Sequence, residues 1–351
     1  MIRRIATILT SVLALALWMA CSDGTVAVPG PPGPGEIGYV PQGWVAPSLL
    51  LEAAAYLPAR VTEFVQAPGV HARNSSFRIE SNEEKLLDWP EGGGVYAPEN
   101  GSLVSLGMAG GYVVLEFDPP LENYPGATDF IVFGNAYFQG GASDRVWQEP
   151  GTVWVREDED SEWLLLAPAV LVDGGWESLA SASSELQTVS YTKGSNDPDW
   201  WPMEEDSSTM DFPGVFMLPD SIYGQGVSSP VLRGLADTAP TLIRGDLSGT
   251  GALNDSGRDD DGIDGEDDYP GIDPAWFYTV PDAPGDRDIR KLSGGGAAMD
   301  LDWALSPSAA FAPAPPVRVK FVKIVSGTKL LNGAVGDYSC EVDAVVRAVH
   351  P

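Results

Sequence analysis

Histidine, cysteine and basic residues are scarce in this chain. Its 351 residues include two His and two Cys, and only 20 Lys and Arg stand against 50 Asp and Glu. With only His71 and His350, a multi-histidine zinc site or a histidine-dependent catalytic triad has almost no material. The formal net charge of −30 makes nucleic acid and anionic lipid headgroups poor partners.

Sequence motifs for acyl and phosphoryl transfer are missing as well. The chain has no nucleophile elbow and no phosphate-cradling loop, and the three glycines at 294–296 fit a turn better. A glycosidase needs only two carboxylates at the right separation, and 50 acidic residues offer many pairs. We therefore expect a non-catalytic protein, with a secreted carbohydrate-active enzyme that uses paired carboxylates as the alternative.

The N-terminal segment has the pattern of a secretory signal. Arg3 and Arg4 precede an apolar stretch at 5–20, which is shorter than the roughly 20 residues of a membrane-spanning helix. Cys21 follows this stretch directly, so the segment resembles a bacterial lipoprotein signal, in which the cysteine is diacylated and becomes the new N-terminus. A lipidated Cys21 would leave Cys340 without a disulfide partner.

The residues around the cleavage point leave two outcomes open. Trp18 and Met19 depart from the usual lipobox, and cleavage after Ala20 without lipidation would give a secreted protein. Ser22 favours outer-membrane sorting by resemblance to lipoproteins. We expect an exported protein at the outer membrane or cell surface, held to the membrane by its N-terminal lipid.

The composition divides the chain into three parts. We expect a signal peptide at 1–20, a lipidated cysteine followed by a Pro/Gly-rich tether at 21–47, and a β domain at 48–351. Within that domain, residues 193–292 are rich in Asp, Gly, Pro and Ser with little periodicity, which indicates a loop-rich insertion.

Short apolar runs between turn residues predict an all-β fold, a jelly-roll-like antiparallel β-sandwich. The runs lie at 103–106, 112–117, 129–133, 152–155, 163–166 and 187–191. A short helix is expected at 49–56. Near the C-terminus, the apolar phase changes between residues 317–321 and 322–324, which indicates a bulge. The alternation at 341–348 predicts a half-buried closing strand.

An acidic segment in the predicted insertion has the composition of a calcium site. Carboxylates recur there at close spacing with bending glycines, and calcium accepts six to eight oxygen ligands in irregular geometry. The segment is not an EF-hand, because Gly257 stands where a bidentate Glu belongs. The alternative is a solvated acidic run. We expect Ca2+ to be held by Asp246, Asp255, Asp259, Asp261, Asp264, Asp267 and Asp268.

Several segments carry a resemblance to known proteins. They are VSLGMAGG at 104–111, VLEF at 114–117, DFIVFGN at 129–135, EP at 149–150, VWV at 153–155, FYTVP at 277–281, SGGG at 293–296, DL at 300–301, FVKI at 321–324 and EVDAV at 341–345. Together they resemble a family of exported bacterial proteins described only as cell surface proteins. The stretch around 259–265 is similar to thrombospondin type 3 repeats. Gly134 and Ala297 stand where the cell surface family usually has acidic residues, which weakens any ligand site that those acids form.

Two kinds of residue are candidate ligand-binding positions. Trp200, Trp201 and Trp154 are candidates because exposed aromatic rings stack on sugars. Polar residues at strand ends in the family-like segments could form a second metal or ligand site, although capping and turn hydrogen bonds are the simpler explanation. These residues are Asn135, Glu149, Asp300, Glu341 and Asp343.

The sequence thus predicts a non-catalytic surface lipoprotein. We expect a calcium-stabilised module that binds a glycan or another small ligand, or that serves in surface attachment. A purely structural envelope component is the remaining alternative.

Overall fold

The structure is a computed structural model of the chain. It describes residues 53–69, 82–94, 98, 103–138, 146–166, 186–193, 207–213, 234–243, 274–279, 294–327, 331–332, 336–337 and 339–348. The predicted signal peptide, tether and calcium-binding segment lie outside the described residues.

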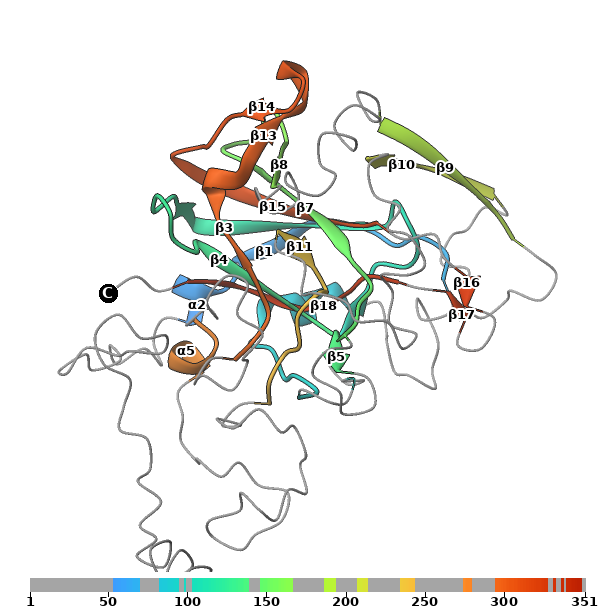
Figure 1. Ribbon diagram of the computed structural model, residues 1–351, viewed down its shortest axis with the longest axis horizontal. Helices are drawn as coiled ribbons and strands as arrows, with labels where there is room; N and C mark the ends of the chain where they lie inside the picture. Colours follow the sequence, from blue (N-terminus) through green and yellow to red (C-terminus); the bar gives the residue numbers. More distant parts are fainter. Residues whose placement is uncertain are drawn as a thin grey trace, which may run out of the picture.

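The described residues form two main sheets, of which the larger contains eight strands (Figure 1). Its strand order is β1 (Arg60–Val65), β3 (Tyr112–Glu122), β15 (Arg318–Ser326), β7 (Gly151–Arg156), β8 (Leu164–Leu166), β13 (Ala304–Ser306) and β14 (Ala312–Pro313). The eighth strand, β11 (Leu235–Ala236), pairs with β7. All of these pairs are antiparallel.

The smaller main sheet lies against the larger one and is also antiparallel. Its order is β12 (Ala297–Met299), β4 (Phe130–Gly134), β18 (Glu341–Arg347) and β2 (Val104–Ser105). In the described part of the chain, three two-stranded pairs accompany the main sheets: β5 (Tyr137–Phe138) with β6 (Val146–Trp147), β9 (Leu186–Thr192) with β10 (Ser207–Pro213), and β16 (Leu331–Asn332) with β17 (Gly336–Asp337).

The helices in the described residues are short. They are α2 (Ala53–Tyr56), η2 (Glu83–Leu87), α5 (Pro274–Phe277), η6 (Leu301–Trp303) and η7 (Pro307–Ala309). Among the residues that the structure describes, no helix is long and apolar enough to cross a membrane. The predicted helix at 49–56 is described only in its last four residues, as α2.

The main hydrophobic core fills the space between the two sheets. The larger sheet contributes Val113, Leu115, Val153 and Ile324, and the smaller sheet contributes Val104, Phe130, Val132 and Val342. All are nearly inaccessible to solvent. The prediction of an all-β antiparallel sandwich is confirmed. The jelly-roll connectivity stays a prediction.

A second core covers the outer face of the smaller sheet. Ile131, Phe133 and Ala344 from the sheet pack there against Phe277 and Tyr278 of the α5 region. The last strand, β18, is therefore buried on both faces, and the expectation of a half-buried closing strand was wrong. The sequence alternation failed to predict this because Glu341 and Asp343 on the polar face are themselves buried and hydrogen-bonded.

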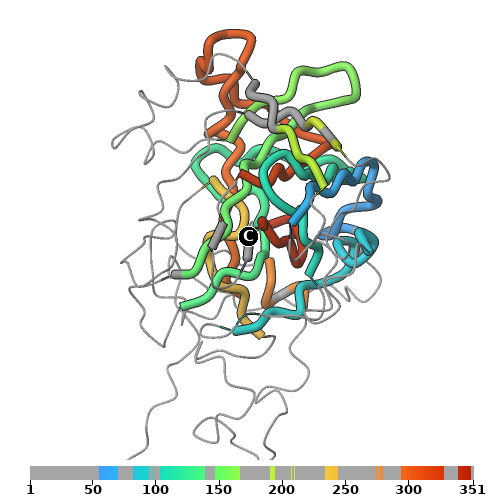
Figure 2. Tube along the Cα trace, turned by 90° about the vertical axis from the view of Figure 1, so that its right-hand side faces the viewer, coloured from blue at the N-terminus to red at the C-terminus, as the bar shows by residue number. Residues whose placement is uncertain are grey.

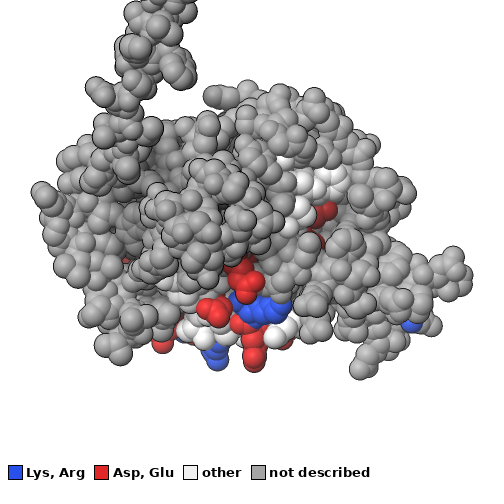
Figure 3. Space-filling model, turned by 90° about the horizontal axis from the view of Figure 1, so that it is seen from below, with Lys and Arg blue, Asp and Glu red and all other residues white. Residues whose placement is uncertain are grey.

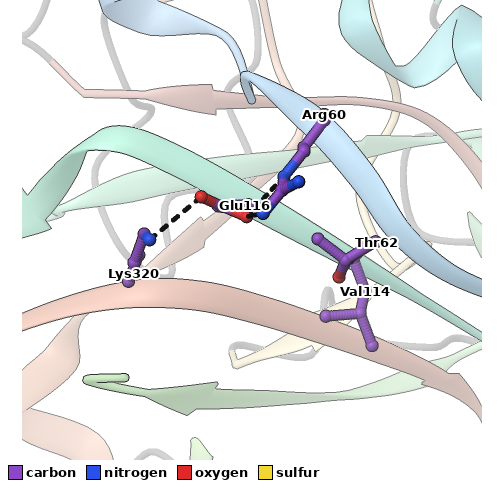
Figure 4. Close-up of polar contacts among 5 residues, drawn as sticks. All are labelled: Arg60, Thr62, Val114, Glu116 and Lys320. Carbon is purple, nitrogen blue, oxygen red and sulfur yellow. Dashed lines mark hydrogen bonds and ion pairs between the residues drawn. The ribbon is translucent and has the colours of Figure 1, made fainter. Parts of the chain in front are cut away.

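The predicted irregularity in the strand after residue 317 is present. The pairing of β15 with β3 shifts register between Val319 and Phe321. Beside the shift, Glu116 of β3 lies between Arg60 and Lys320, with ion-pair distances of 2.5 Å and 3.0 Å (Figure 4). Burial raises the pKa of Glu116, but its hydrogen bonds and charge interactions with Lys320 and Arg60 outweigh this and lower the pKa below its ordinary value.

Two turns meet at one end of the larger sheet. Figure 2 shows the turn between β7 and β8 near the β13–η7–β14 segment. The carboxylate of Glu162 in this turn accepts hydrogen bonds from the Ser306 hydroxyl and the Ser308 backbone N–H, at 2.8 Å and 2.7 Å. Within the described surface seen from below, acidic side chains border a small basic area (Figure 3).

Candidate functional site

Three of the predicted site residues meet at one end of the smaller sheet. Asn135 follows β4 directly, Glu341 begins β18, and Glu149 lies between β6 and β7. The antiparallel pairing of Val342 with Gly134 brings the first two together, and the Asn135 amide Nδ2 donates to Glu341 Oε2 at 2.5 Å. The β5–β6 pair returns the chain to this end, because Tyr137 pairs with Trp147 two residues before Glu149.

Asp237 is a fourth member of this group. Its carboxylate accepts backbone N–H groups of Asn135 at 2.7 Å and Glu341 at 3.0 Å, and it also accepts the N–H of Ala136. Asp237 thereby joins the end of β4 to the start of β18, and its own backbone has a left-handed φ of 55°. Burial raises its pKa to about 7 although the backbone N–H groups lower it.

Glu149 is a buried carboxyl group of the site with a raised pKa. It is 6% exposed, and burial raises its pKa well above the ordinary value. The negative charges of Glu341 and Asp237 raise this pKa further, whereas hydrogen bonds from the Ser339 backbone and the Trp147 side chain lower it. Like charges at close range favour either a retained proton or a bound cation.

An aromatic pair borders the acidic group. The rings of Tyr137 and Trp147 are stacked with centroids 6.4 Å apart and an interplanar angle of 18°. Both side chains are partly exposed. Burial raises the pKa of Tyr137, and the charges of Glu149 and Glu341 add to this effect, so the phenol lies close to both carboxylates.

Ser339 and Cys340 complete the interior of the site. Ser339 is fully buried, and its hydroxyl has no hydrogen-bond partner. Cys340 is a free, buried thiol. Burial raises its pKa, with smaller contributions from Asp237, Glu149 and Glu341, which favours the protonated thiol. We name the set Asn135, Glu149, Asp237, Ser339 and Glu341 the acidic site.

Asp343 lies on the same strand as Glu341 but serves another contact. Its carboxylate accepts the backbone N–H groups of Gly92 at 3.0 Å and Glu91 at 3.4 Å. It therefore fastens the segment after η2 to the smaller sheet. This is the structural role that polar residues at strand ends often have.

Asp300 belongs to a second acidic group at the opposite end of β4. It caps η6 by accepting the N–H of Asp302 at 2.8 Å. Asp129 lies beside it and accepts the N–H groups of Tyr124 and Leu301, each at 2.7 Å. Burial raises the pKa of Asp129 to about 7, and the charges of Asp300 and Asp302 raise it further.

Of the three tryptophans predicted to bind a ligand, the structure describes only Trp154. Trp154 points to the opposite face from Val153 and Val155, but it is only 6% exposed, and its indole N–H donates to the Thr152 hydroxyl at 3.0 Å. It lies in the larger sheet, outside the acidic site. Trp200 and Trp201 lie outside the described residues.

The predicted calcium ligands are also outside the described residues. They are Asp246, Asp255, Asp259, Asp261, Asp264, Asp267 and Asp268. Within the described ranges, no group of three or more His, Cys, Asp or Glu side chains is arranged to hold a metal ion. A cation at the acidic site would therefore need neutral oxygen ligands in addition to carboxylates.

Sequence reasoning missed Asp237, Tyr137, Trp147 and Ser339 as site residues. Asp237 lies in a stretch without periodicity, so nothing marked it among the 50 acidic residues. In the folded chain, however, Asp237 lies against Gly134: a Cβ added to Gly134 would lie 2.7 Å from Asp237 Oδ1. The Asp237 carboxylate thus lies beside residue 134, the position at which we expected the lack of an acidic side chain to weaken a ligand site.

No known protein-family model matches the chain, and no curated protein is significantly similar to it. The resemblance to bacterial cell surface proteins and to thrombospondin type 3 repeats therefore stays a prediction from the quoted segments.

Proposed function

We propose that this protein is an exported, non-catalytic binding module whose ligand, a glycan or another small polar molecule, binds at the acidic site. The observation that carries the proposal is the convergence of Asn135, Glu149 and Glu341 beside the stacked Tyr137 and Trp147 rings. Partly exposed aromatic rings offer a stacking surface, and neighbouring amide and carboxyl groups bind hydroxyls.

The rest of the proposal follows from the sequence. Lipidation of Cys21 would tether the module to the outer membrane or cell surface through the Pro/Gly-rich segment. Calcium bound by the acidic segment would stabilise the fold, because its charge offsets the mutual repulsion of the carboxylates. A jelly-roll connectivity and a role in surface attachment agree with this proposal.

The experiment is a glycan array probed with the purified protein and with Trp147→Ala. Trp163→Ala is the control, since Trp163 stacks with Arg156 on the larger sheet and lies outside the acidic site. Binding that is lost with Trp147→Ala and kept with Trp163→Ala supports the proposal. The double variant Trp200→Ala/Trp201→Ala, probed on the same array, tests whether these two predicted tryptophans contribute to glycan binding. An array without any signal favours a structural envelope component.

A carbohydrate-active enzyme is the second candidate. It is favoured by one observation, the raised pKa of Glu149 beside Glu341, since glycosidases pair a protonated acid with a second carboxylate. The test is release of reducing sugar from a glycan panel. Hydrolysis that disappears with Glu149→Gln establishes the enzyme and overturns the non-catalytic proposal.

A further inference from the structure

Two neighbouring loops bring exposed apolar side chains together. Val317, in the link between β14 and β15, is 74% exposed, and Tyr124, in the turn between β3 and β4, is 48% exposed. The backbone N–H of Asn123 donates to the Val317 carbonyl oxygen at 2.9 Å, so the two loops lie side by side (Figure 1). Pro125 and Pro315 in the same loops are also exposed. We name Tyr124, Pro125, Pro315 and Val317 the apolar patch.

Hydrogen bonds hold both loops of the apolar patch in place. The Asn123 amide Nδ2 donates to the Pro316 carbonyl oxygen at 2.9 Å and to Asp302 Oδ1 at 3.2 Å. The other carboxylate oxygen of Asp302 accepts the backbone N–H of Gly126 at 2.7 Å. A surface that is ordered before binding loses little conformational entropy when a partner docks on it. The patch therefore suits rigid docking against another folded surface.

The apolar patch is neutral in a chain of strong negative charge. Its loops belong to the stretches 123–128 and 303–317, which contain no charged residue, whereas the whole chain has a formal charge of −30. Two copies of such a chain repel each other through their acidic surfaces, and they repel least where neutral surfaces meet. Apolar side chains that are exposed together, and not singly, are typical of protein interfaces.

The charges beside the apolar patch are one of each sign. Arg318 follows Val317 directly, and Glu122 lies two residues before Tyr124. Both charged residues are exposed, and they are partners in the pairing of β15 with β3. In a contact between copies related by a two-fold axis, the same surface of each copy meets that of the other. Arg318 of each copy can then face Glu122 of the other, so the border of the patch is complementary to itself.

We infer that the apolar patch is a self-association surface, on which a second copy of this chain docks across a two-fold axis. Burial of Val317 and Tyr124 against the second copy removes apolar surface from water. A patch of four side chains implies a weak dimer and not a permanent one. The patch shares no residue with the acidic site, so the inference does not depend on the proposed function.

The test is sedimentation velocity of the purified protein from about 1 to 100 µM, the range expected for a weak dimer. All samples carry Cys21→Ser, so that no lipid holds copies together. Val317→Asp should weaken association by about tenfold or more, because it places a charge in the contact. It should keep the wild-type thermal midpoint, because the side chain is exposed. Val65→Asp is the matched control, since Val65 is a 37% exposed valine at the end of β1, outside the patch.

Each outcome of the sedimentation experiment decides the inference. Association of wild type and Val65→Asp that is lost only in Val317→Asp supports it. Equal association of all three proteins would overturn it, since copies would then meet through another surface. Equal loss in both variants would also overturn it, because added negative charge alone would explain the loss. A wild type that stays monomeric overturns it as well and leaves a different protein as the partner of the patch.

Discussion

The buried carboxylates of this fold differ in the neighbouring groups that stabilise or destabilise their negative charge. Glu116 has two cationic partners, and Asp237 has three backbone N–H groups. Glu149 has two negatively charged neighbours, and Asp129 has two backbone N–H groups but also nearby acids. The direction of each pKa shift reflects this balance between burial, partners and like charges.

Asp129 predicts a pH dependence of stability. Its folded pKa of about 7 lies above its ordinary value of 3.8, so the folded state keeps a proton that the unfolded state loses. The stabilisation by this proton is complete below about pH 4 and is lost as the pH rises towards 7. Asp237 and Glu149 contribute in the same direction, so urea titrations at several pH values should show a decline in both proteins that is smaller in Asp129→Asn than in wild type by an amount on the order of 1–4 kcal/mol. Parallel profiles for wild type and the variant would contradict this.

Glu116 predicts the opposite pH dependence. Because its partners lower its folded pKa, the stabilisation is present above the ordinary pKa and is lost as the pH falls. Glu116→Gln should lower the free energy of unfolding at neutral pH by about 1–3 kcal/mol. The difference from wild type should shrink in acid. A difference that stays constant with pH would show that packing, not charge, is what the substitution changes.

At the scale of elements, the last residue of β18 links this strand to elements outside its own sheet. Arg347 donates to the backbone carbonyls of Ala55, Pro119 and Pro120, which joins the smaller sheet to α2 and to β3. Arg318, the first residue of β15, is exposed and therefore serves as the control position for Arg347.

Replacement of Arg347 therefore predicts a measurable loss of stability. Arg347→Met should lower the free energy of unfolding by about 2–4 kcal/mol, because three carbonyls lose a charged donor. Arg318→Met, an equal change at an exposed position, should stay within about 0.5 kcal/mol of wild type. Denaturant unfolding of both variants measures this. Similar losses in the two variants would refute the role assigned to Arg347.

Elements were easier to predict from the sequence than the site. The runs at 112–117 and 152–155 lie in β3 and β7, because apolar alternation and turn residues are local properties. Asn135, Glu149 and Glu341 were found because they follow or begin such strands. Asp237 and the Tyr137–Trp147 pair depend on long-range pairing, which a local pattern does not contain. Burial of both faces of β18 likewise could not be predicted locally, because its outer face is covered by Phe277 and Tyr278, which are far away in the sequence.

At the scale of the whole molecule, negative charge is in large excess. Four of the 20 basic residues, Arg60, Arg156, Lys320 and Lys323, contact Glu116 or the aromatic rings of Tyr112, Trp163 and Phe321 on the larger sheet. Much of the formal charge of −30 must then be screened by salt or bound cations. The calcium binding and the lipid-anchored location that we propose agree with this excess of negative charge.

Lipidation is directly testable on the intact chain. Expression in a Gram-negative host with radioactive palmitate should label the wild type and move it to the detergent phase. Cys21→Ser should abolish both effects, since the acceptor thiol is lost. An unlabelled wild type whose mature N-terminus is a free Cys21 would instead establish ordinary cleavage after Ala20.

The central claim is that the acidic site is a ligand site, and a crystal structure of the protein with a glycan that it binds tests this claim most directly. We expect the sugar ring to pack against the Tyr137 and Trp147 rings, with its hydroxyls hydrogen-bonded to Asn135, Glu149 or Glu341. A sugar bound at another surface, with the acidic site unchanged, would contradict the claim.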